Sequence, residues 1–350
     1  MYRDAEEDLN RIEELLVREI LGENAYLQFK RGKIGHEELK PHIPAILKLS
    51  QAYNLKDKAT ETTLKDIRLL EAYSIYFLPI NYVKIRYLFD KIELDKIVAN
   101  SPKILDFGCG PGTAALAAVN YLRKKSEIFL LDSSVNAGHF AKDLIYKFSS
   151  QKATCLKEPE WKKYRYDLII AANTINEVMS GQVEKLVEDM HVALKDKGIL
   201  LILEPALKEK TKKAMEIRDL ILKKYDHMKP LYPCTRKDSC PMLSSSAKDW
   251  CHGSISWSQS RLVKQVDKMT GFNKHRLKYS AFIFQKNGTL KEGYRVVSIG
   301  DKSRGAFTAK LCGKDFFGTV RLSKKTKNEK SKVLKKTNLH DLLPPDGIER

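Results

Sequence analysis

A glycine-rich turn between an apolar run and a helical segment is the feature that most constrains this chain. The sequence reads Ile-Leu-Asp-Phe-Gly-Cys-Gly-Pro-Gly over residues 104–112, and an alanine-rich stretch begins at Thr113. Glycines in such a turn allow the backbone to approach a ligand closely, while the helix N-terminus offers free N–H groups and a positive dipole end. The order of strand, turn and helix therefore predicts a Rossmann-like nucleotide-binding unit.

The spacing of Gly108, Gly110 and Gly112 favours S-adenosylmethionine over a nicotinamide dinucleotide, whose turn reads Gly-x-Gly-x-x-Gly. Asp106, at the end of the strand, is expected to orient the turn or to reach the methionine ammonium group. Asp132 closes the next predicted strand, where an acid accepts ribose hydroxyls. These five residues are the predicted core of the cofactor site.

The run from Ala172 to Glu177 follows a later strand and is expected at the carboxyl edge of the sheet, where ligands bind in α/β proteins. Asn173 is a further candidate for cofactor binding, and Asn173 and Glu177 are candidates for facing the methyl group and the substrate. A structural interpretation stays open, with Asn176 as a helix N-cap and Glu177 as a first-turn acid. The catalytic residues are therefore left unassigned.

Short apolar runs alternate with helical segments between Lys103 and Lys286, which is typical of βαβ units and a doubly wound, mainly parallel sheet. Expected strands cover 103–107, 128–132, 167–172, 198–204 and 277–285, and expected helices cover 113–125, 134–149, 181–194 and 208–225. The predicted fold class is α/β, with a Rossmann-like methyltransferase domain over 101–290. Residues 1–100 are expected to form an N-terminal helical domain in which Pro79 divides two helices, one ending near Phe77.

The segment 227–253 is rich in Pro, Cys and Ser and does not fit this alternation, so we interpret it as an insertion. Short β-like runs at 294–299, 306–311 and 316–322 predict a small β appendage over 291–322. Residues 323–350 are expected to form a basic tail.

The chain carries 63 Lys and Arg against 44 Asp and Glu, a formal net charge of +19. Six lysines crowd the stretch between Arg321 and Lys336, namely Lys324, Lys325, Lys327, Lys330, Lys332 and Lys335. Such a block fits an arm that neutralises phosphates, and nucleic acid is the expected partner. A solubilising tail is the alternative interpretation.

No apolar run is long enough to cross a bilayer, and the first residues show neither a signal nor a transit peptide. We therefore expect a cytoplasmic, monomeric protein without a membrane partner. A mature organellar form stays open.

The six cysteines fall into two groups. Cys109 and Cys155 are interpreted as packing or incidental thiols. The others are Cys234, Cys240 and Cys251, in the irregular segment, and Cys312, on the predicted appendage. In a reducing compartment, clustered cysteines favour a metal over disulfides. Their spacing leaves the metal open, His252 raises the possibility of a Cys₃His zinc site, and unliganded thiols are the remaining alternative.

Several stretches together resemble the methyltransferase-like proteins associated with the ribosomal small subunit, best known from mitochondria. They are residues 72–82, 104–113, 170–177, 203–205 and 217–220, followed by Pro233-Cys234, Cys240-Pro241, Trp250-Cys251-His252 and Leu311-Cys312-Gly313. The resemblance implies an S-adenosylmethionine-fold protein that acts on small-subunit rRNA or its assembly. It also implies a four-iron four-sulfur cluster on Cys234, Cys240, Cys251 and Cys312, with His252 outside the ligand set.

Three functions follow as expectations. The first is an S-adenosylmethionine-dependent rRNA methyltransferase, and the second is a non-catalytic assembly factor that uses the same fold for binding. The third is a small-molecule methyltransferase with structural zinc.

Overall fold

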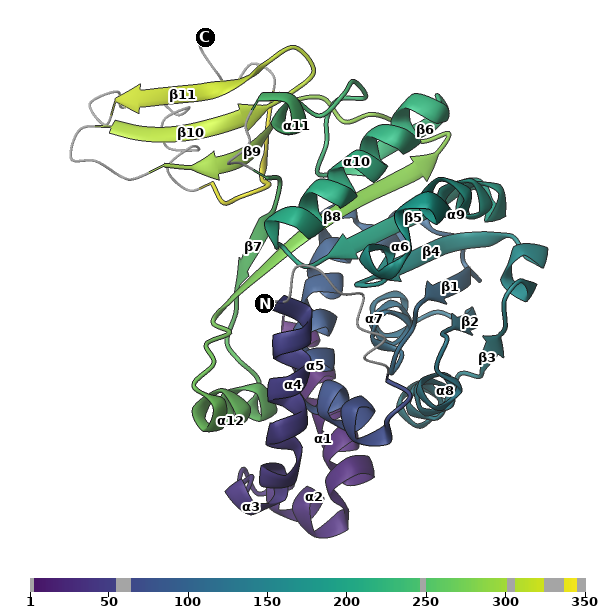
Figure 1. Ribbon diagram of the computed structural model, residues 1–350, viewed down its shortest axis with the longest axis vertical. Helices are drawn as coiled ribbons and strands as arrows, with labels where there is room; N and C mark the ends of the chain where they lie inside the picture. The colour runs from purple at the N-terminus through teal and green to yellow at the C-terminus, as the bar shows by residue number, and fades with distance from the viewer. Residues whose placement is uncertain (1–2, 55–63, 246–249, 301–305, 324–336, 345–350) are drawn as a thin grey trace.

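The computed structural model describes residues 3–54, 64–245, 250–300, 306–323 and 337–344, in which an eight-stranded sheet lies between two layers of helices (Figure 1). In sheet order the strands are β3 (Ala153–Leu156), β2 (Glu127–Leu131), β1 (Lys103–Phe107), β4 (Tyr166–Ala172), β5 (Leu194–Glu204), β8 (Arg276–Lys286) and β6 (Met228–Tyr232), while β7 (Gly253–Ser256) pairs with β8. Neighbours from β3 to β5 are parallel, and β8 runs antiparallel to both β5 and β6. The predicted doubly wound α/β fold is confirmed.

Apolar side chains alternate between the two faces of the parallel strands, as the two-residue period of a strand requires. Ile104 and Leu130 pack against α5 (Ile67–Ile92), α7 (Thr113–Leu122) and α8 (Val135–Ser149). Leu105 and Phe129 face the opposite side, where α9 (Ser180–Ala193) and α10 (Lys208–Lys224) lie. The β–α connections meet at the carboxyl ends of the parallel strands, and this edge positions the candidate site.

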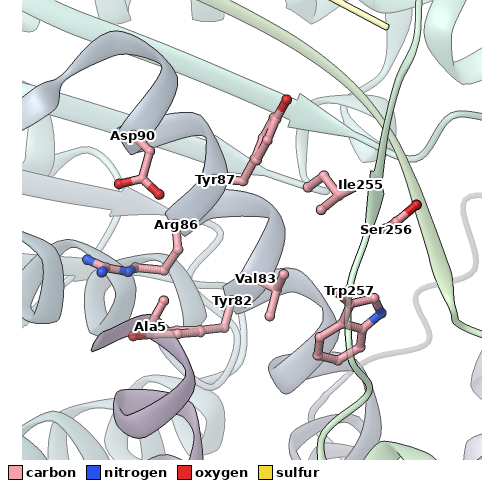
Figure 2. Close-up of a pocket in the computed structure, with 9 residues that line it drawn as sticks. All are labelled: Ala5, Tyr82, Val83, Arg86, Tyr87, Asp90, Ile255, Ser256 and Trp257. Atoms are coloured by element: carbon pink, nitrogen blue, oxygen red, sulfur yellow. The ribbon is translucent and has the colours of Figure 1, made fainter. Parts of the chain in front are cut away.

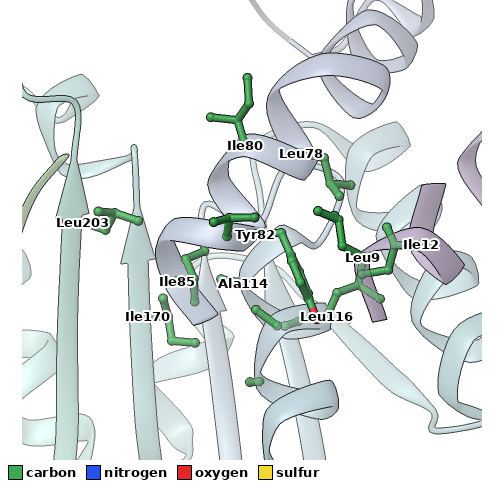
Figure 3. Packing of buried hydrophobic residues seen from close by; sticks show 14 of the residues in the cluster. Leu9, Ile12, Leu78, Ile80, Tyr82, Ile85, Ala114, Leu116, Ile170 and Leu203 are labelled. Atoms are coloured by element: carbon green, nitrogen blue, oxygen red, sulfur yellow. The ribbon is translucent and has the colours of Figure 1, made fainter. Parts of the chain in front are cut away.

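The N-terminal helices share the core of the sheet domain. They are α1 (Arg3–Leu16), α2 (Glu23–Lys30), α3 (His36–Leu39), α4 (Ile43–Asn54), α5 and α6 (Leu94–Ile97), with a π-helical turn at Val17–Leu21 and a 3₁₀ turn at Lys40–His42. Leu9 of α1, Leu78 and Ile85 of α5 and Leu116 of α7 belong to one hydrophobic cluster (Figure 3). Helix α5 therefore serves both as a sheet-covering helix and as the base of the N-terminal layer.

Helix α5 runs unbroken over Ile67–Ile92, so the prediction that Pro79 divides two helices near Phe77 is wrong. A proline inside a helix removes one backbone hydrogen bond and crowds the preceding turn, at a cost of about 3 kcal/mol. Leu78 and Ile80 are buried on either side of it. Burying each such side chain stabilises the fold by about 1.5–3 kcal/mol, which is enough to offset the proline.

The segment 227–253, expected to be irregular, contains strand β6 and the short helix α11 (Pro241–Ser245). Pro230 lies inside β6 and argues against a strand when only the sequence is considered. Strand β6 is at the edge of the sheet, where a proline is tolerated because its missing N–H faces away from the ladder. The amphipathic helix α12 (Arg261–Thr270) then packs against α5.

A separate antiparallel sheet forms the appendage, in the order β11-β10-β9-β12. Its strands are β9 (Tyr294–Ile299), β10 (Ala306–Cys312), β11 (Phe317–Ser323) and β12 (Leu342–Leu343), and the first three match the predicted runs. Residues 323–350 were expected to form one tail, but β12 returns to pair with β9. The six-lysine block lies outside the described residues. None of the helices in the described ranges is long and apolar enough to cross a bilayer.

Candidate functional site

The glycine turn is held between β2 and the loop after β4. The backbone N–H groups of Gly108 and Cys109 donate to the Leu131 carbonyl at 2.7 and 3.0 Å. Gly108 has a φ of 69°, and a Cβ at this position would lie 2.2 Å from Oγ1 of Thr174. The hydroxyl of Thr174 in turn donates to the Gly108 carbonyl at 3.4 Å. Only glycine fits here, because both the backbone angle and the approach of Thr174 exclude a side chain.

Two of the predicted cofactor residues orient the turn. Asp106 is buried, and its Oδ2 accepts a hydrogen bond from the Ala115 N–H at 2.8 Å, in the first turn of α7. Asp132 accepts from the Gly110 N–H through Oδ2 and from the Ser134 N–H through Oδ1, both at 2.8 Å. The two side chains therefore hold the backbone at Gly110, at Ser134 and at Ala115 in the first turn of α7.

The loop after β4 brings Asn173 to the same edge. Asn173 adopts a φ of 59°, a left-handed conformation that asparagine tolerates better than most residues, and its N–H donates to the Leu203 carbonyl at 2.7 Å. The adjacent 3₁₀ turn (Ile175–Glu177) is capped by Glu204, which accepts from the Ile175 N–H at 2.9 Å and from the Asn176 side-chain amide at 2.8 Å. The contacts of Asn176 are therefore structural.

Four carboxyl groups share this desolvated edge. Burial raises the pKa of Asp106 and of Glu204 to about 7. Burial also raises the pKa of Asp132 and of Glu177, and the charge of Asp132 adds to the shift of Glu177. Ionised carboxylates are costly in such a place unless a cation accompanies them. The arrangement is therefore chemically suited to a positively charged ligand.

Helix α5 and the residues just before it also lie beside the site. Burial raises the pKa of Tyr73, and the charges of Glu177, Asp106 and Asp132 add to the shift, while its hydroxyl accepts a hydrogen bond from the Asn81 amide at 2.9 Å. The Leu64 carbonyl, just before α5, accepts from the Ser134 hydroxyl at 2.9 Å, and the Leu64 side chain lies against Gly110. Periodicity places these residues in a separate helical region, so no sequence pattern indicates a role for them at the site.

The four candidate metal cysteines are free thiols, of which Cys240 and Cys251 are buried and Cys234 and Cys312 are partly buried. Burial raises the pKa of Cys240 to about 11 and that of Cys312 to about 12, and the Cys234 thiol adds to both shifts. Burial likewise holds the pKa of Cys251 well above its usual range, with further shifts from the other three. The four side chains belong to, or pack against, one hydrophobic cluster on the α9 and α10 side of the sheet. Within the described ranges, no three or more His, Cys, Asp or Glu side chains stand as a metal-binding group.

A buried ion pair positions one of these cysteines. Arg218 of α10 is 1% exposed, pairs with Asp219 and donates to the carbonyls of Arg236 and Asp238. Asp219 in turn accepts the Cys240 N–H at 2.9 Å. The loop that carries the cysteines is thus anchored to α10 through polar contacts.

Two histidines lie near the cysteines, and they differ in the atoms that their ring nitrogens contact. Nδ1 of His252 is 3.0 Å from the Trp250 carbonyl, and its ring stacks on Trp250. His340, from the C-terminal segment, places Nε2 3.5 Å from the Cys251 sulfur. The imidazole in contact with a cysteine sulfur is therefore that of His340, to which no sequence motif points. Of the remaining cysteines, Cys155 contacts the Gly138 carbonyl at 3.4 Å, on α8.

A cavity of about 330 Å³ opens between the start of α1, α5 and β7 (Figure 2). Arg86, Tyr87 and Trp257 are among its lining residues. Arg86 is 7% exposed and stacks on Tyr121, 4.7 Å from the ring centroid. None of the predicted site residues lines this cavity.

The strand order and the glycine turn together define a Rossmann-like methyltransferase fold. The chain belongs to the Rsm22 family, described as mitochondrial small ribosomal subunit Rsm22, whose model matches residues 69–344. No curated protein matches the chain.

Two solved structures show a remote likeness to this chain. TehB from Haemophilus influenzae is 13% identical, with a TM-score of 0.35 over 56% of this chain and 61% of that one. The plantazolicin methyltransferase BpumL is 13% identical, with a TM-score of 0.37 over 72% of this chain and 98% of that one. The fold assignment rests on the strand order and not on these likenesses.

Proposed function

We propose that this protein binds S-adenosylmethionine at the glycine turn and acts on the rRNA of the small ribosomal subunit or on its assembly. The observation that carries the proposal is the desolvated carboxylate edge beside the turn, at Asp106, Asp132 and Glu177. S-adenosylmethionine carries a sulfonium and an ammonium group, so its charge complements this edge. Membership of the Rsm22 family supports the small ribosomal subunit as the partner.

We propose that Cys234, Cys240, Cys251 and Cys312 hold a four-iron four-sulfur cluster. The support is the chemistry of the residues. Four free thiols lie in a largely buried region, and the charges of the other three raise the pKa of Cys251. When bound, such a cluster would offer one-electron chemistry and cross-link the loop after β6 to the appendage. The buried guanidinium of Arg218 adds positive charge beside the thiols, which favours their ionised, ligating form.

Methyl transfer to rRNA is the catalytic form of this proposal. The test uses full-length protein, labelled S-adenosylmethionine and immature small subunits, with Asp132→Asn as the cofactor-site variant. We expect label in the rRNA with the wild type and its loss in the variant, while binding to the subunits is retained. Absence of label with every subunit preparation would overturn the catalytic form.

A non-catalytic assembly factor is the second candidate, and the contacts of Asn176 favour it. Its amide is engaged by Glu204 and by the Lys210 carbonyl, so the loop after β4 is tied down structurally. This candidate predicts that Asp132→Asn leaves both ribosome binding and subunit maturation unchanged. Failure of maturation in that variant would contradict it.

The identity of the metal is tested separately by absorption spectroscopy of anaerobically purified protein. We expect the broad visible absorption of an iron-sulfur cluster. A colourless protein with stoichiometric zinc would overturn the cluster and favour a small-molecule methyltransferase with structural zinc.

A further inference from the structure

The C-terminal segment around β12 brings a buried imidazole against one of the cysteines. His340 is fully buried, and its Nε2 lies 3.5 Å from the Cys251 sulfur. Its backbone N–H donates to the Val296 carbonyl at 2.7 Å, and the Arg295 guanidinium donates to its carbonyl at 2.6 Å. The next residue, Asp341, forms an ion pair with Lys91 of α5 at 3.0 Å. The imidazole is therefore fixed in place by contacts to two other parts of the fold.

The other ring nitrogen of His340 is held by a chain of hydroxyl groups. Nδ1 lies 2.9 Å from the Tyr232 hydroxyl, which lies 2.6 Å from the hydroxyl of Tyr279. Tyr232 and Tyr279 belong to β6 and β8, and both side chains are fully buried. Tyr279 also packs against Tyr87 of α5, 6.0 Å between ring centroids. Both nitrogens thus have a defined partner.

The chemistry of a ligating sulfur fixes the direction of these bonds. A thiolate that is bound to iron has no proton, so it can only accept a hydrogen bond. Nε2 of His340 must then carry the proton, and Nδ1 must accept one from Tyr232. The oxygen of Tyr232 remains free to accept from Tyr279. Both imidazole nitrogens and the Tyr232 hydroxyl have a partner in this arrangement, which matters because these side chains are buried.

We propose that His340 is a positioning residue for the cluster, donating a hydrogen bond from Nε2 to the sulfur of Cys251. This inference rests on the proposed iron-sulfur function. Hydrogen bonds to ligating sulfurs stabilise the more negative, reduced cluster and orient the ligand. The C-terminal segment thereby becomes part of the cluster site, although it lies 89 residues beyond Cys251.

The experiment compares full-length wild type, His340→Phe and His340→Gln after anaerobic purification, and measures iron content and reduction potential. His340→Phe removes the donor, so we expect a more negative potential and faster loss of iron to a chelator. Loss of an outer-shell partner commonly weakens metal binding about 10- to 100-fold. His340→Gln retains an N–H donor and should restore part of both properties.

A matched control uses the histidine that adjoins Cys251 in sequence. His252 contacts the Trp250 carbonyl, so His252→Phe should leave the potential unchanged. Where His340→Phe fails to fold, Tyr232→Phe decides, because it removes one oxygen and leaves the imidazole without its orienting partner. We expect a smaller shift of the potential in the same direction.

Two failures are distinguishable. Wild-type protein without iron would overturn the proposed cluster and this inference together. Iron-loaded wild type with an unchanged potential in His340→Phe, or in Tyr232→Phe where that variant decides, would overturn the role of His340 and leave the cluster proposal standing.

Discussion

The glycine-turn site and the cysteine region are assembled in different ways. The turn site draws on consecutive strand ends, and Asp106, Gly108 and Asp132 lie within 27 residues of sequence. The cysteine region joins α10, the loop after β6, the appendage and the C-terminal segment, so Cys240 and His340 become neighbours of Cys251 only after folding. The first site is acidic, and the second combines thiols with buried arginines. A site built from contacts between distant parts of the sequence forms only when all of these parts have folded together.

Replacing one cysteine should have the largest effect, and it should affect the cysteine region without affecting the glycine-turn site. We expect Cys240→Ser to abolish the cluster and to loosen the appendage, because the free energy of binding a structural metal group is also free energy of folding. Iron content and limited proteolysis would measure both effects. Cofactor binding at the glycine turn should persist.

The matched control is Cys155→Ser, which replaces an exposed thiol on β3. It should leave iron content and protease resistance unchanged. Equal iron in Cys240→Ser and wild type would remove Cys240 from the ligand set.

Adding a single methyl group should disable the other region. Gly108→Ala places a Cβ against Thr174 at a positive φ, so we expect loss of S-adenosylmethionine binding and destabilisation by about 1–3 kcal/mol. Calorimetry of cofactor binding and thermal unfolding would measure these effects. Iron content should not change, which is the reverse of the result expected for Cys240→Ser.

Gly181→Ala is the matched control, because this glycine lies in α9 with no heavy atom within 4 Å of its Cβ position. Alanine is favoured over glycine inside a helix by about 1 kcal/mol. The control should therefore be neutral or slightly stabilising. Normal cofactor affinity in Gly108→Ala would contradict the assigned turn.

The local character of the turn site explains why its fold could be predicted from the sequence. Each strand end that forms the edge is an apolar run that stops at a turn, and β1 matches its predicted bounds of 103–107. The missed strand β6 contains Pro230, whose tolerance depends on an edge position that no local pattern reveals. Pro79 was misread for the same reason, since the packing of α5 decides whether the helix continues.

The cysteine region could be predicted only in part. Four cysteines in irregular or β-rich segments are visible in the sequence, but their common neighbourhood is a property of the tertiary structure. His340 gave no signal, because it lies in a stretch that reads as a basic tail. His252 adjoins a cysteine in sequence, yet its nitrogen contacts the Trp250 carbonyl. The imidazole in contact with the Cys251 sulfur is instead that of His340, 89 residues further along the chain.

The six-lysine block offers a test that concerns neither site. Changing Lys324, Lys325, Lys327, Lys330, Lys332 and Lys335 to glutamine should weaken rRNA binding and reduce its salt dependence. The slope of log K against log salt should fall by roughly 0.7 for each phosphate that the arm no longer neutralises, as for single strands. Filter binding at several salt concentrations would measure the slope. The same six positions changed to arginine keep the charge and serve as the control, and an unaltered slope in the glutamine variant would exclude the arm.

The last test changes pH and concerns the acidic glycine-turn site alone. The pKa of Asp106 is raised to about 7, so its carboxyl is largely protonated below that pH. A cationic ligand favours the ionised form, and affinity for S-adenosylmethionine should therefore rise about tenfold per unit up to about pH 7 and then level off. Asp106→Asn should weaken this dependence, and the raised pKa values of Asp132, Glu177 and Glu204 should preserve part of it.

The unliganded protein should show the opposite trend in stability. Asp106 and Glu204 keep their protons in the folded state up to about pH 7. In the unfolded chain such groups lose them near pH 4. The folded state thus binds more protons across this window, and these two groups make stability fall as pH rises from about 4 to about 7.

S-adenosylhomocysteine lacks the sulfonium charge, so its affinity should depend less on pH. An equal pH dependence for both ligands would show that the carboxylates do not sense the sulfonium.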